Sequence, residues 1–467
     1  MMIIKFISLM LIFSCSISTA KSLTKQNRFS ELHHKFFLTD NDYRFETIKN
    51  YINKHNRFIS DHQVLAYKYR AMANSPYSFF RATNHLMYAD MESGDLELPK
   101  GWNEKSHASW VIADMHVQNI SYWDTKQSLK PETVYFLDDF DESLVLPVTV
   151  DLFRYLVSLE LFMDRLNFKV SRHERLNTLD EFVRTYRKVL IKAKDKKIKQ
   201  SPLKQMHKEL QKIQFAKVHK KLLNKWTISN DGKRQFNTKN PKLAVLSEKE
   251  ELMLRRRWRL WQLKLPHTKA KQLDILDIKA RVYSGLGSLG VKRFYILTEG
   301  PSQNLKDDLI LELKQQVTSS VAVNNPSLVS QFNNHYPKNE ALRNLTAQQA
   351  LYGALFPFQT DLQFDGDYYL VRQMLPYVGS IKTKLIQSVN DLHMITKCAS
   401  EIMAISHLRA RHSLQYNTKL FRKTLSRYLE NNISSLVSES VKYADTVRKD
   451  HILFAKNIDE VLDESTR

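Results

Sequence analysis

Short apolar runs and longer helical patterns alternate along this chain. Four stretches combine β-branched or aromatic residues with short apolar runs or period-two alternation, namely residues 134–137, 291–297, 307–316 and 368–376. Such runs, when turn-forming or charged residues bound them, predict strands. An apolar helical pattern follows Asp151, and a helical tail begins near Ile381. The mixture predicts an α+β protein.

Changes in pattern divide the chain into sections. We expect a signal peptide at residues 1–20, a first part at 21–170, a basic helical section at 171–275, a strand-rich part at 276–380 and a C-terminal helical section at 381–467. A chain of 467 residues can bury a substantial core. No internal repeat or low-complexity tract interrupts it.

The first twenty residues have the pattern of an export signal. Lys5 precedes an apolar stretch over residues 6–17, and the small residues 18–20 follow. A positive residue, an apolar core and a small-residue cleavage site are typical of a secretory signal peptide. We therefore expect a periplasmic or secreted protein. Lipoprotein processing at Cys15 is the alternative, which Phe13 fits poorly.

Beyond this segment, no stretch approaches the roughly 18 consecutive apolar residues of a membrane-spanning helix. No transmembrane span is therefore expected in the mature chain. Removal of residues 1–20 would leave Cys398 as its single cysteine. This excludes an intramolecular disulfide and a structural zinc site built on clustered thiolates.

Positive charge is concentrated in the middle of the chain. The sequence has 71 Lys and Arg against 49 Asp and Glu, a formal net charge of +22. Residues 186–226 hold fourteen basic and two acidic residues with near-helical apolar spacing, and four arginines surround Trp258 within residues 255–259. Such faces suit an anionic partner, either nucleic acid, anionic lipid or a phosphorylated substrate. A solvated lysine-rich helix has the same pattern.

Candidate chemistry begins with Asp114, His116 and Asn119, just ahead of the first predicted strand. Phosphoryl transfer needs a carboxylate to orient the acceptor hydroxyl and oxygen ligands to hold Mg²⁺ between the phosphates. In protein kinases a metal-binding Asn follows the catalytic Asp by five positions. Asp114 and Asn119 have this spacing.

A second metal-binding carboxylate has to arrive from a neighbouring strand. The strand at residues 134–137 is followed by Asp138, Asp139 and Asp141. We expect Asp139 to bind the metal, with Asp141 as second choice and Asp138 as third. The competing interpretation is a solvated acidic turn, which is common after strands.

Gly285, Gly287 and Gly290 form a G-x-G-x-x-G arrangement, which contains three of the chain's 10 glycines. Glycine permits close backbone approach to phosphate groups. A dinucleotide-binding fingerprint would open a helix, whereas residues 291–297 predict a strand. A strand–loop–strand hairpin over nucleotide phosphates fits better, and a plain tight hairpin is the alternative.

A lysine near this loop would pair with phosphate oxygens. Lys314, near the end of the 307–316 strand, is our candidate, with Lys292 and Lys306 as alternatives. The neighbours of Lys314 are glutamines, so the sequence does not assign the glutamate that usually pairs with such a lysine.

Four segments resemble a bacterial family known as domain of unknown function 2252. They are SPYSFFRATNHLMYAD (75–90), DMHVQN (114–119), FLDDFDES (136–143) and VDLFRYLVSLE (150–160). The family pattern is roughly Gly-Asp-x-His-x-x-Asn-Phe-Gly, then Asn-Asp-Phe-Asp-Glu, then Trp-Asp-Leu-x-Arg-Leu. Residues 368–373 and the segment with His407 and Arg409 also resemble family segments, as does the position of Lys314.

These motifs are similar to the aminoglycoside phosphotransferase branch of the protein-kinase-like superfamily. There a structural Asp follows the metal-binding Asp by about a dozen residues, as Asp151 follows Asp139. The resemblance implies a two-lobed kinase-like fold with extra helices, ATP and Mg²⁺ as cofactors, catalytic residues Asp114 and His116, and metal ligands Asn119, Asp139 and Asp141. It also implies nucleotide contacts from the glycine loop and Lys314.

The chain departs from the family pattern at three places. Ala113 replaces the Gly, Ile120 and Ser121 replace Phe-Gly, and Asp138 replaces the Asn. The candidate carboxylates are kept.

The order of the motifs is unusual, because the catalytic loop precedes the glycine loop. A circularly permuted kinase-like fold satisfies this order, since active sites are defined by geometry and role. Our leading hypothesis is an exported phosphotransferase acting on an unknown acceptor. The alternative is a catalytically inactive kinase-like module that binds an anionic partner through its basic section.

Overall fold

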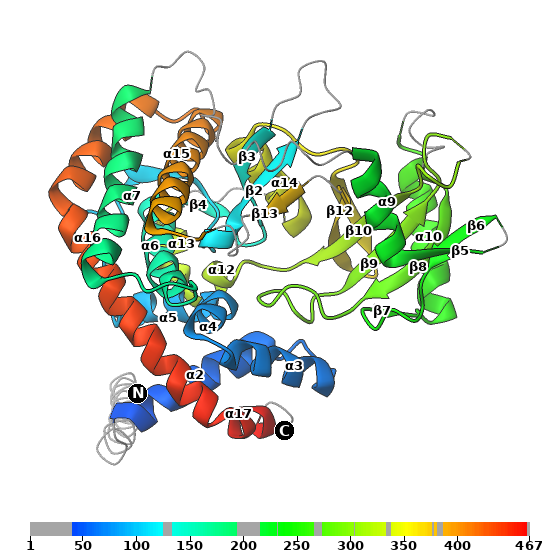
Figure 1. Ribbon diagram of the computed structural model, residues 1–467, viewed down its shortest axis with the longest axis horizontal. Helices are drawn as coiled ribbons and strands as arrows, with labels where there is room; N and C mark the ends of the chain where they lie inside the picture. Colours follow the sequence, from blue (N-terminus) through cyan, green and yellow to red (C-terminus); the bar gives the residue numbers. More distant parts are fainter. Residues whose placement is uncertain are drawn as a thin grey trace, which may run out of the picture.

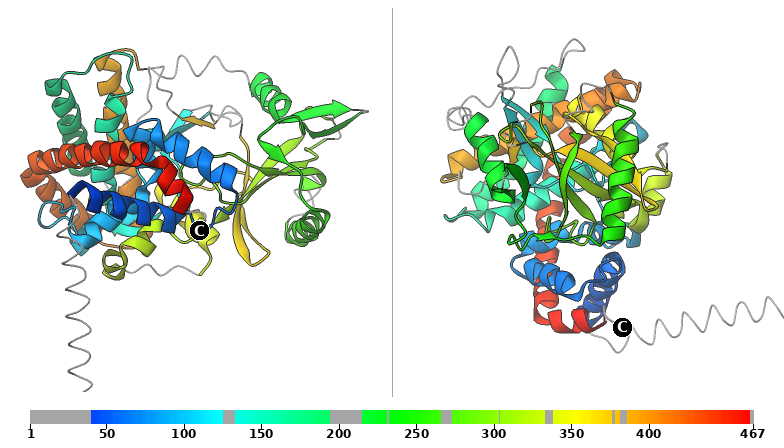
Figure 2. Two further views of the ribbon diagram at one scale, coloured as in Figure 1. Left: turned by 90° about the horizontal axis from the view of Figure 1, so that it is seen from below. Right: turned by 90° about the vertical axis from the view of Figure 1, so that its right-hand side faces the viewer.

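The computed structural model describes residues 40–124, 133–193, 215–230, 232–265, 273–302, 304–332, 338–375, 378–380 and 386–464. These residues form a helical part and a sheet part that lie side by side (Figures 1 and 2). The prediction of an α+β protein is confirmed.

The helical part contains most of the helices. They are α2 (Asp40–Asn56), α3 (His62–Ala73), α4 (Pro76–Ala82), α5 (Asn84–Ser93), α6 (Thr149–Met163), α7 (Arg172–Lys192), α12 (Ser320–Asn324), α13 (Pro326–Ser330), α15 (Val389–Ser413), α16 (Thr418–Lys456) and α17 (Ile458–Glu464). Helix α6 is buried along its whole length, α7 and α16 pack against it, and α15 packs on α7. The long α16 then runs down to the layer formed by α2, α3 and α17 (Figure 1).

Two small antiparallel sheets lie within the helical part. One pairs β1 (Ala108–Val111) with β4 (Leu144–Pro147), and the other has the order β13 (Val378–Ser380), β2 (Ile120–Asp124), β3 (Thr133–Leu137). Two single 3₁₀ turns, Lys105–His107 and Val117–Asn119, lie before β1 and before β2. The segment between β1 and β2 is the predicted catalytic loop.

The sheet part is built on one six-stranded antiparallel sheet. Its spatial order is β11 (Thr360–Phe364), β12 (Asp367–Gln373), β10 (Leu309–Gln316), β9 (Arg293–Thr298), β8 (Ile275–Arg281), β7 (Leu243–Ala244). Helix α10 (Glu248–Gln262) covers one face through Trp258 and Leu254. Helix α9 (Phe215–Trp226) and the hairpin of β5 (Thr227–Asn230) and β6 (Lys233–Phe236) cover the other through Trp226 and Phe236.

Because both faces are covered, the central strands are buried on both sides, although one face of β10 carries the buried polar residues Glu312 and Lys314. All six residues of β9 are buried, and so are all but one of the eight residues of β10. Helix α14 (Glu340–Tyr352) contacts strands β11 and β12 and also α15. It therefore joins the sheet part to the helical part.

The four predicted strands are confirmed as β3, β9, β10 and β12. Residues 171–275 contain the helices α7, α9 and α10, as expected of a helical section, but also the strands β5–β7. Helix α7 belongs to the helical part, whereas α9, α10 and strands β5–β7 belong to the sheet part. The sequence Asn230-Asp231-Gly232 is a hairpin signal between two short polar strands, and Gly232 has φ +72°. Strands as polar as β5 and β6 have too little apolar periodicity to be predicted from the sequence.

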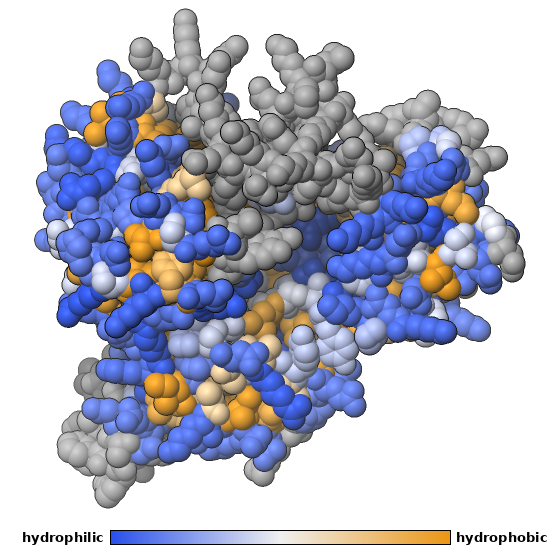
Figure 3. All heavy atoms as spheres, viewed as in Figure 1, coloured by the Kyte–Doolittle hydropathy of each residue, from blue (hydrophilic) through white to orange (hydrophobic). Residues whose placement is uncertain are grey.

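Local capping explains where several helices begin. Ser171 and Glu174 form a reciprocal capping box at the start of α7. Ser75 caps α4, in which Pro76 occupies the first position, where no backbone N–H is needed. On the face seen in Figure 3, the surface is mostly hydrophilic and is hollowed between the two parts.

Candidate functional site

A cleft lies where the helical part meets the sheet part. Its walls include Asp114 and His116 from the catalytic loop, Asp139 and Asp141 from the segment after β3, and Gly285, Gly287 and Ser288 from the loop between β8 and β9. The cavity volume is about 120 Å³. The predicted acidic residues and the predicted glycine loop therefore converge on one site, although more than 140 residues of sequence separate them.

One buried carboxylate fixes the catalytic loop. Asp151, in the first turn of α6, accepts hydrogen bonds from the backbone N–H groups of Ile112 and Ala113, both at 2.8 Å. Its Oδ2 also lies 3.1 Å from Nε2 of His407 on α15. Nδ1 of His407 in turn lies 2.8 Å from the hydroxyl of Tyr186. With its Nε2–H donated to Asp151, His407 accepts from Tyr186 and acts as a structural link between helices.

The backbone conformation of Ala113 explains why the pattern Gly-Asp-x-His-x-x-Asn, which this loop resembles, has glycine at this position. Its φ is +61°, in the left-handed region that costs an alanine about 1–2 kcal/mol. The strained peptide is held from both sides, because Asp151 accepts from its N–H and Tyr88 donates to its carbonyl oxygen at 2.7 Å. The turn aims the next residue, Asp114, into the cleft.

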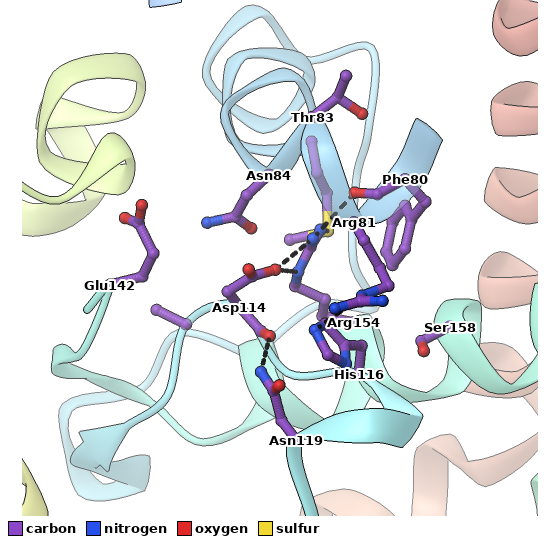
Figure 4. Close-up of polar contacts among 12 residues, drawn as sticks. Phe80, Arg81, Thr83, Asn84, Asp114, His116, Asn119, Glu142, Arg154 and Ser158 are labelled. Atoms are coloured by element: carbon purple, nitrogen blue, oxygen red, sulfur yellow. Dashed lines mark hydrogen bonds and ion pairs between the residues drawn. The ribbon is translucent and has the colours of Figure 1, made fainter. Parts of the chain in front are cut away.

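Asp114 is held by a buried arginine that the sequence interpretation did not single out. Nε and Nη2 of Arg154 both donate to Oδ1 of Asp114, at 2.9 and 2.5 Å (Figure 4). Arg154 is fully buried, and its Nη2 also donates to the carbonyl oxygen of Phe80. Among the described residues, no hydrogen bond is recorded for Oδ2 of Asp114, so this oxygen is left to the cleft.

The surroundings of Asp114 raise the pKa of its carboxyl group. Burial raises the pKa to about 7, and the carboxylates of Glu142 and Asp139 add to the rise, although Arg154 opposes it. A carboxyl with a pKa near neutrality can exchange a proton at physiological pH.

Asn119 and His116 organise the loop from within. Asn119 Nδ2 donates to the carbonyl oxygen of Asp114 at 2.9 Å, which leaves the amide oxygen for other partners (Figure 4). His116 is buried, and Arg81 Nε lies 3.1 Å from its Nε2. Burial, with the charges of Arg81 and Arg154, holds the pKa of His116 well below its usual range. A neutral ring that accepts from an arginine is poorly placed to act as a base.

The three aspartates after β3 have different partners. Asp138 accepts from Ser121 Oγ at 2.8 Å. Asp141 pairs with the Lys314 ammonium through Oδ2 and with Asn344 Nδ2, at 3.0 Å, through Oδ1. Despite burial, Lys314 holds the pKa of Asp141 below its usual range.

Asp139 is the least occupied of the three. Its φ is +67°, its side chain is half exposed, and its Oδ1 lies 3.6 Å from Nζ of Lys314. Lys314 itself is buried and lies near the end of β10, so it links the sheet part to the helical part. Of the three candidate lysines, Lys314 is the one that contacts the cleft carboxylates. Lys292 and Lys306 are exposed.

Within the described ranges, no three His, Cys, Asp or Glu side chains are grouped as ligands for a metal ion. Magnesium at phosphoryl-transfer sites is usually bound through one or two protein oxygens together with substrate phosphates and water. The free amide oxygen of Asn119 and the half-exposed carboxylate of Asp139 fit that requirement. A preformed all-protein metal site is not needed.

The glycine loop is a hairpin docked on the N-terminal helices. It joins the antiparallel strands β8 and β9, as predicted from the strand pattern after Gly290. Gly285 and Gly290 have φ of +73° and +96°. A side chain at Gly290 would clash with Ile59, and the carbonyl oxygen of Gly287 accepts a hydrogen bond from Lys68 Nζ at 3.0 Å. Gly290 therefore serves packing, whereas Gly285 and Gly287 face the cleft.

Three residues that shape the cleft were not among the site residues predicted from the sequence. Arg343 of α14 donates to the carbonyl oxygens of Asp141 and Ser143, and it is fully buried. Glu142 lines the cleft and accepts from the backbone N–H of Ser320 at 2.6 Å. Arg154 lies in the VDLFRYLVSLE segment, at the arginine of the pattern Trp-Asp-Leu-x-Arg-Leu that this segment resembles.

The remaining predicted features lie outside the cleft or outside the described residues. Residues 1–20 and the stretch 194–214 of the basic section are not among the described residues. Trp258 is buried and donates to the carbonyl oxygen of Leu273, while Arg255 pairs with Glu251 on the same helix. Arg409 donates to the last carbonyls of α14. None of the described helices is both long and apolar enough to cross a membrane.

Comparison with known proteins shows the family. A family model described as "Uncharacterized protein conserved in bacteria (DUF2252)" matches residues 60–457, so the chain belongs to this family. The matched range includes the catalytic loop, the acidic cluster, the glycine hairpin and Lys314. Searches of curated proteins and of solved structures found no significant match.

We expect Ala113→Gly to be tolerated better than a glycine substitution in a helix. Glycine adopts φ +61° without steric strain, whereas Ala66→Gly within α3 should destabilise by about 1 kcal/mol. Urea denaturation of both variants measures the difference. A larger loss for Ala113→Gly than for Ala66→Gly would show that the left-handed turn is not strained.

Asp151→Ala is expected to destabilise the protein by roughly 3–5 kcal/mol, because it removes a buried, multiply hydrogen-bonded carboxylate. Asp180→Ala is the matched control, since Asp180 pairs with Arg184 at the surface and should cost less than about 1 kcal/mol. Urea denaturation of the two variants gives both values. Equal losses would contradict the anchoring role.

Proposed function

We propose that this protein is a phosphotransferase that moves the γ-phosphoryl group of Mg-ATP to a hydroxyl of an acceptor molecule. The observation that carries the proposal is the single cleft in which the glycine hairpin faces Asp114, with Asp139, Asp141 and Lys314 at its side. Phosphoryl transfer requires such a set of positioning and charge-stabilising groups rather than covalent chemistry from the protein.

The topology of the sheet part supports a kinase-like two-lobed fold in a circularly permuted order. The glycine hairpin joins β8 and β9, the lysine lies on the next strand, β10, and α14 then packs near the sheet. Protein kinases place their Gly-rich loop, strand lysine and following helix in this sequence. Here the catalytic loop precedes these elements in the chain instead of following them.

One contact differs from the kinase arrangement. The kinase lysine pairs with a glutamate of the helix that follows it, whereas Lys314 pairs with Asp141 from the helical part. Helix α14 supplies Asn344 and Arg343, which bind the side chain and the carbonyl of Asp141. We propose that Lys314 turns to the nucleotide phosphates when they enter, and that Asn344 then keeps Asp141 in place.

The roles of the remaining residues follow from their free atoms. Oδ2 of Asp114 would orient the acceptor hydroxyl and take the proton of that hydroxyl. The hydroxyl oxygen would bond to the γ-phosphorus as the bond to the leaving ADP breaks. The amide oxygen of Asn119 and the carboxylate of Asp139 would hold Mg²⁺, which neutralises phosphate charge when bound. Gly285 and Gly287 would cover the phosphates through their backbone. His116 would position Arg81 and the loop rather than act on the substrate.

Asp114→Asn and Asp139→Asn should separate catalysis from nucleotide binding. We expect both to lower Mg²⁺-dependent ADP formation at least about 100-fold. Asp114→Asn should still be stabilised thermally by Mg-ATP, since its side chain binds the acceptor, whereas Asp139→Asn should lose this stabilisation. Ligand at 100 times its Kd stabilises by about 2.7 kcal/mol, which thermal denaturation detects.

Asp180→Ala is the control for these variants, because Asp180 lies on the exposed side of α7. Wild-type turnover in both cleft variants would refute the assigned roles. Absence of thermal stabilisation of the native protein by millimolar Mg-ATP would refute nucleotide binding altogether and favour the catalytically inactive module.

The acid limb of the pH profile should report Asp114. Its pKa is raised to about 7, so the carboxyl is protonated below that pH, and kcat/KM should fall as pH falls through about 7. Glu142→Gln should move this limb to lower pH, because Glu142 contributes to the raised pKa. Glu430→Gln, at an exposed pair with Arg187, should leave it unchanged. A flat profile between about pH 6 and pH 8 would contradict the role of Asp114.

A further inference from the structure

The N-terminal helices bring basic and imidazole groups to one end of the cleft. They are Lys68 of α3, Arg81 of α4, His55 of α2 and His85 of α5. Of the four, His55 and Arg81 line the cleft, whereas Lys68 and His85 are fully buried, and Lys68 is hydrogen-bonded to the glycine hairpin. The function proposed above uses none of these four side chains on a substrate.

Lys68 is a buried cation without a counter-ion. Its side chain is fully buried, and its one recorded contact is the hydrogen bond from Nζ to the Gly287 carbonyl oxygen at 3.0 Å. No carboxylate in the described part of the chain pairs with it. Burial lowers its pKa to about 7. An unpaired buried charge is unfavourable, so its presence beside a cleft points to a ligand that pairs with it.

Arg81 is a second cation without a carboxylate partner. Its Nε lies against His116, and its Nη1 donates to Gln118 Oε1 at 2.7 Å. Both contacts are to neutral groups, and they fix the guanidinium plane at the cleft wall. The nearby carboxylate of Asp114 is already neutralised by Arg154.

Neutral hydrogen-bonding groups complete this end of the cleft. The rings of His55 and His85 stack with their centroids 4.0 Å apart. Both ring nitrogens of His85 are buried with no hydrogen-bond partner in the described structure. Burial and the charge of Lys68 lower the pKa of His55 to about 3, so its ring is neutral. Neutral imidazole N–H groups donate hydrogen bonds to anions.

We propose that this end of the cleft binds an oxyanion, a phosphate or carboxylate group, carried by the acceptor molecule. The two ends of the cleft have opposite character. Figure 4 shows Glu142 and Arg81 on opposite sides of Asp114, and Asp139 and Asp141 accompany Glu142 in the acidic segment after β3. The acidic end suits the metal ion of a bound nucleotide, and the basic end, which the glycine hairpin also borders, suits an oxyanion.

The acceptor would then present its hydroxyl to Asp114 while Arg81 binds its anionic group directly and the buried Lys68 adds positive charge next to the site. The assignment to the acceptor rests on the proposed phosphotransferase function. The oxyanion site itself does not, because anion binding can be measured without nucleotide.

Inorganic phosphate is the probe, titrated calorimetrically into the full-length protein. We expect Arg81→Gln and Lys68→Met each to weaken phosphate binding at least about tenfold, since each removes a positive charge at or next to the site. Lys249→Met is the control with the same charge change at an exposed position of α10, and it should bind phosphate as the native protein does. Malonate in a parallel titration shows whether carboxylate or phosphate is preferred.

Folding does not confound the result. Replacing an unpaired buried ammonium with an isosteric apolar side chain is expected to preserve or raise the thermal midpoint of Lys68→Met. A role limited to structure would lower the midpoint and leave phosphate affinity unaltered. That outcome, or the absence of phosphate and malonate binding to the native protein, would overturn the oxyanion site.

A second titration, in saturating magnesium and a non-hydrolysable ATP analogue, tests the assignment to the acceptor. Undiminished phosphate affinity supports a separate acceptor subsite. Competition would assign the site to the nucleotide's own phosphate and overturn the acceptor role. Failure of the analogue to bind, with phosphate binding still dependent on Lys68 and Arg81, would defeat the phosphotransferase proposal but support the oxyanion site.

Discussion

The carboxylate of Asp151 is the constraint on which the cleft depends. It satisfies two backbone N–H groups of the catalytic loop and contacts His407, so it ties the loop to α6 and α15 together. Each of these groups is buried and would be costly to leave without a partner. The left-handed conformation of Ala113, and with it the direction of Asp114, follows from this anchoring.

A second constraint joins the two parts of the molecule. Lys314 from β10 pairs with Asp141 of the helical part, and Arg343 and Asn344 of α14 bind the same aspartate. A buried ion pair of this kind adds little net stability but fixes geometry, since either charge alone would be uncompensated. The acidic cluster is thereby held against the sheet that carries the glycine hairpin.

Charge is distributed unevenly along the cleft. Asp139, Asp141 and Glu142 line one end, Arg81 lines the other with Lys68 buried nearby, and the Asp114–Arg154 pair lies between them. Burial raises the pKa of Asp114 and the carboxylates of Glu142 and Asp139 add to the rise, whereas burial by itself lowers the pKa of Lys68. A reaction between a metal-bound phosphate donor and an anionic acceptor fits this polarity.

The sequence by itself determined the local elements of the site. Strand β3 and its acidic end, the hairpin around Gly285 and Gly287, and the strand that carries Lys314 were all predictable, because period, turn residues and motif spacing are local properties. Spacing also related Asp151 to the acidic cluster.

Only the tertiary structure decided which of these groups meet and what state they are in. The pairing of Asp114 with Arg154, the pairing of Lys314 with Asp141 and the burial of Lys68 depend on contacts between segments 40 to 219 residues apart. Residues 171–275 are divided between the two parts because both the sheet and α6 have faces that other elements must cover. Long-range packing and desolvation set these outcomes, and neither leaves a periodic signal in one sequence.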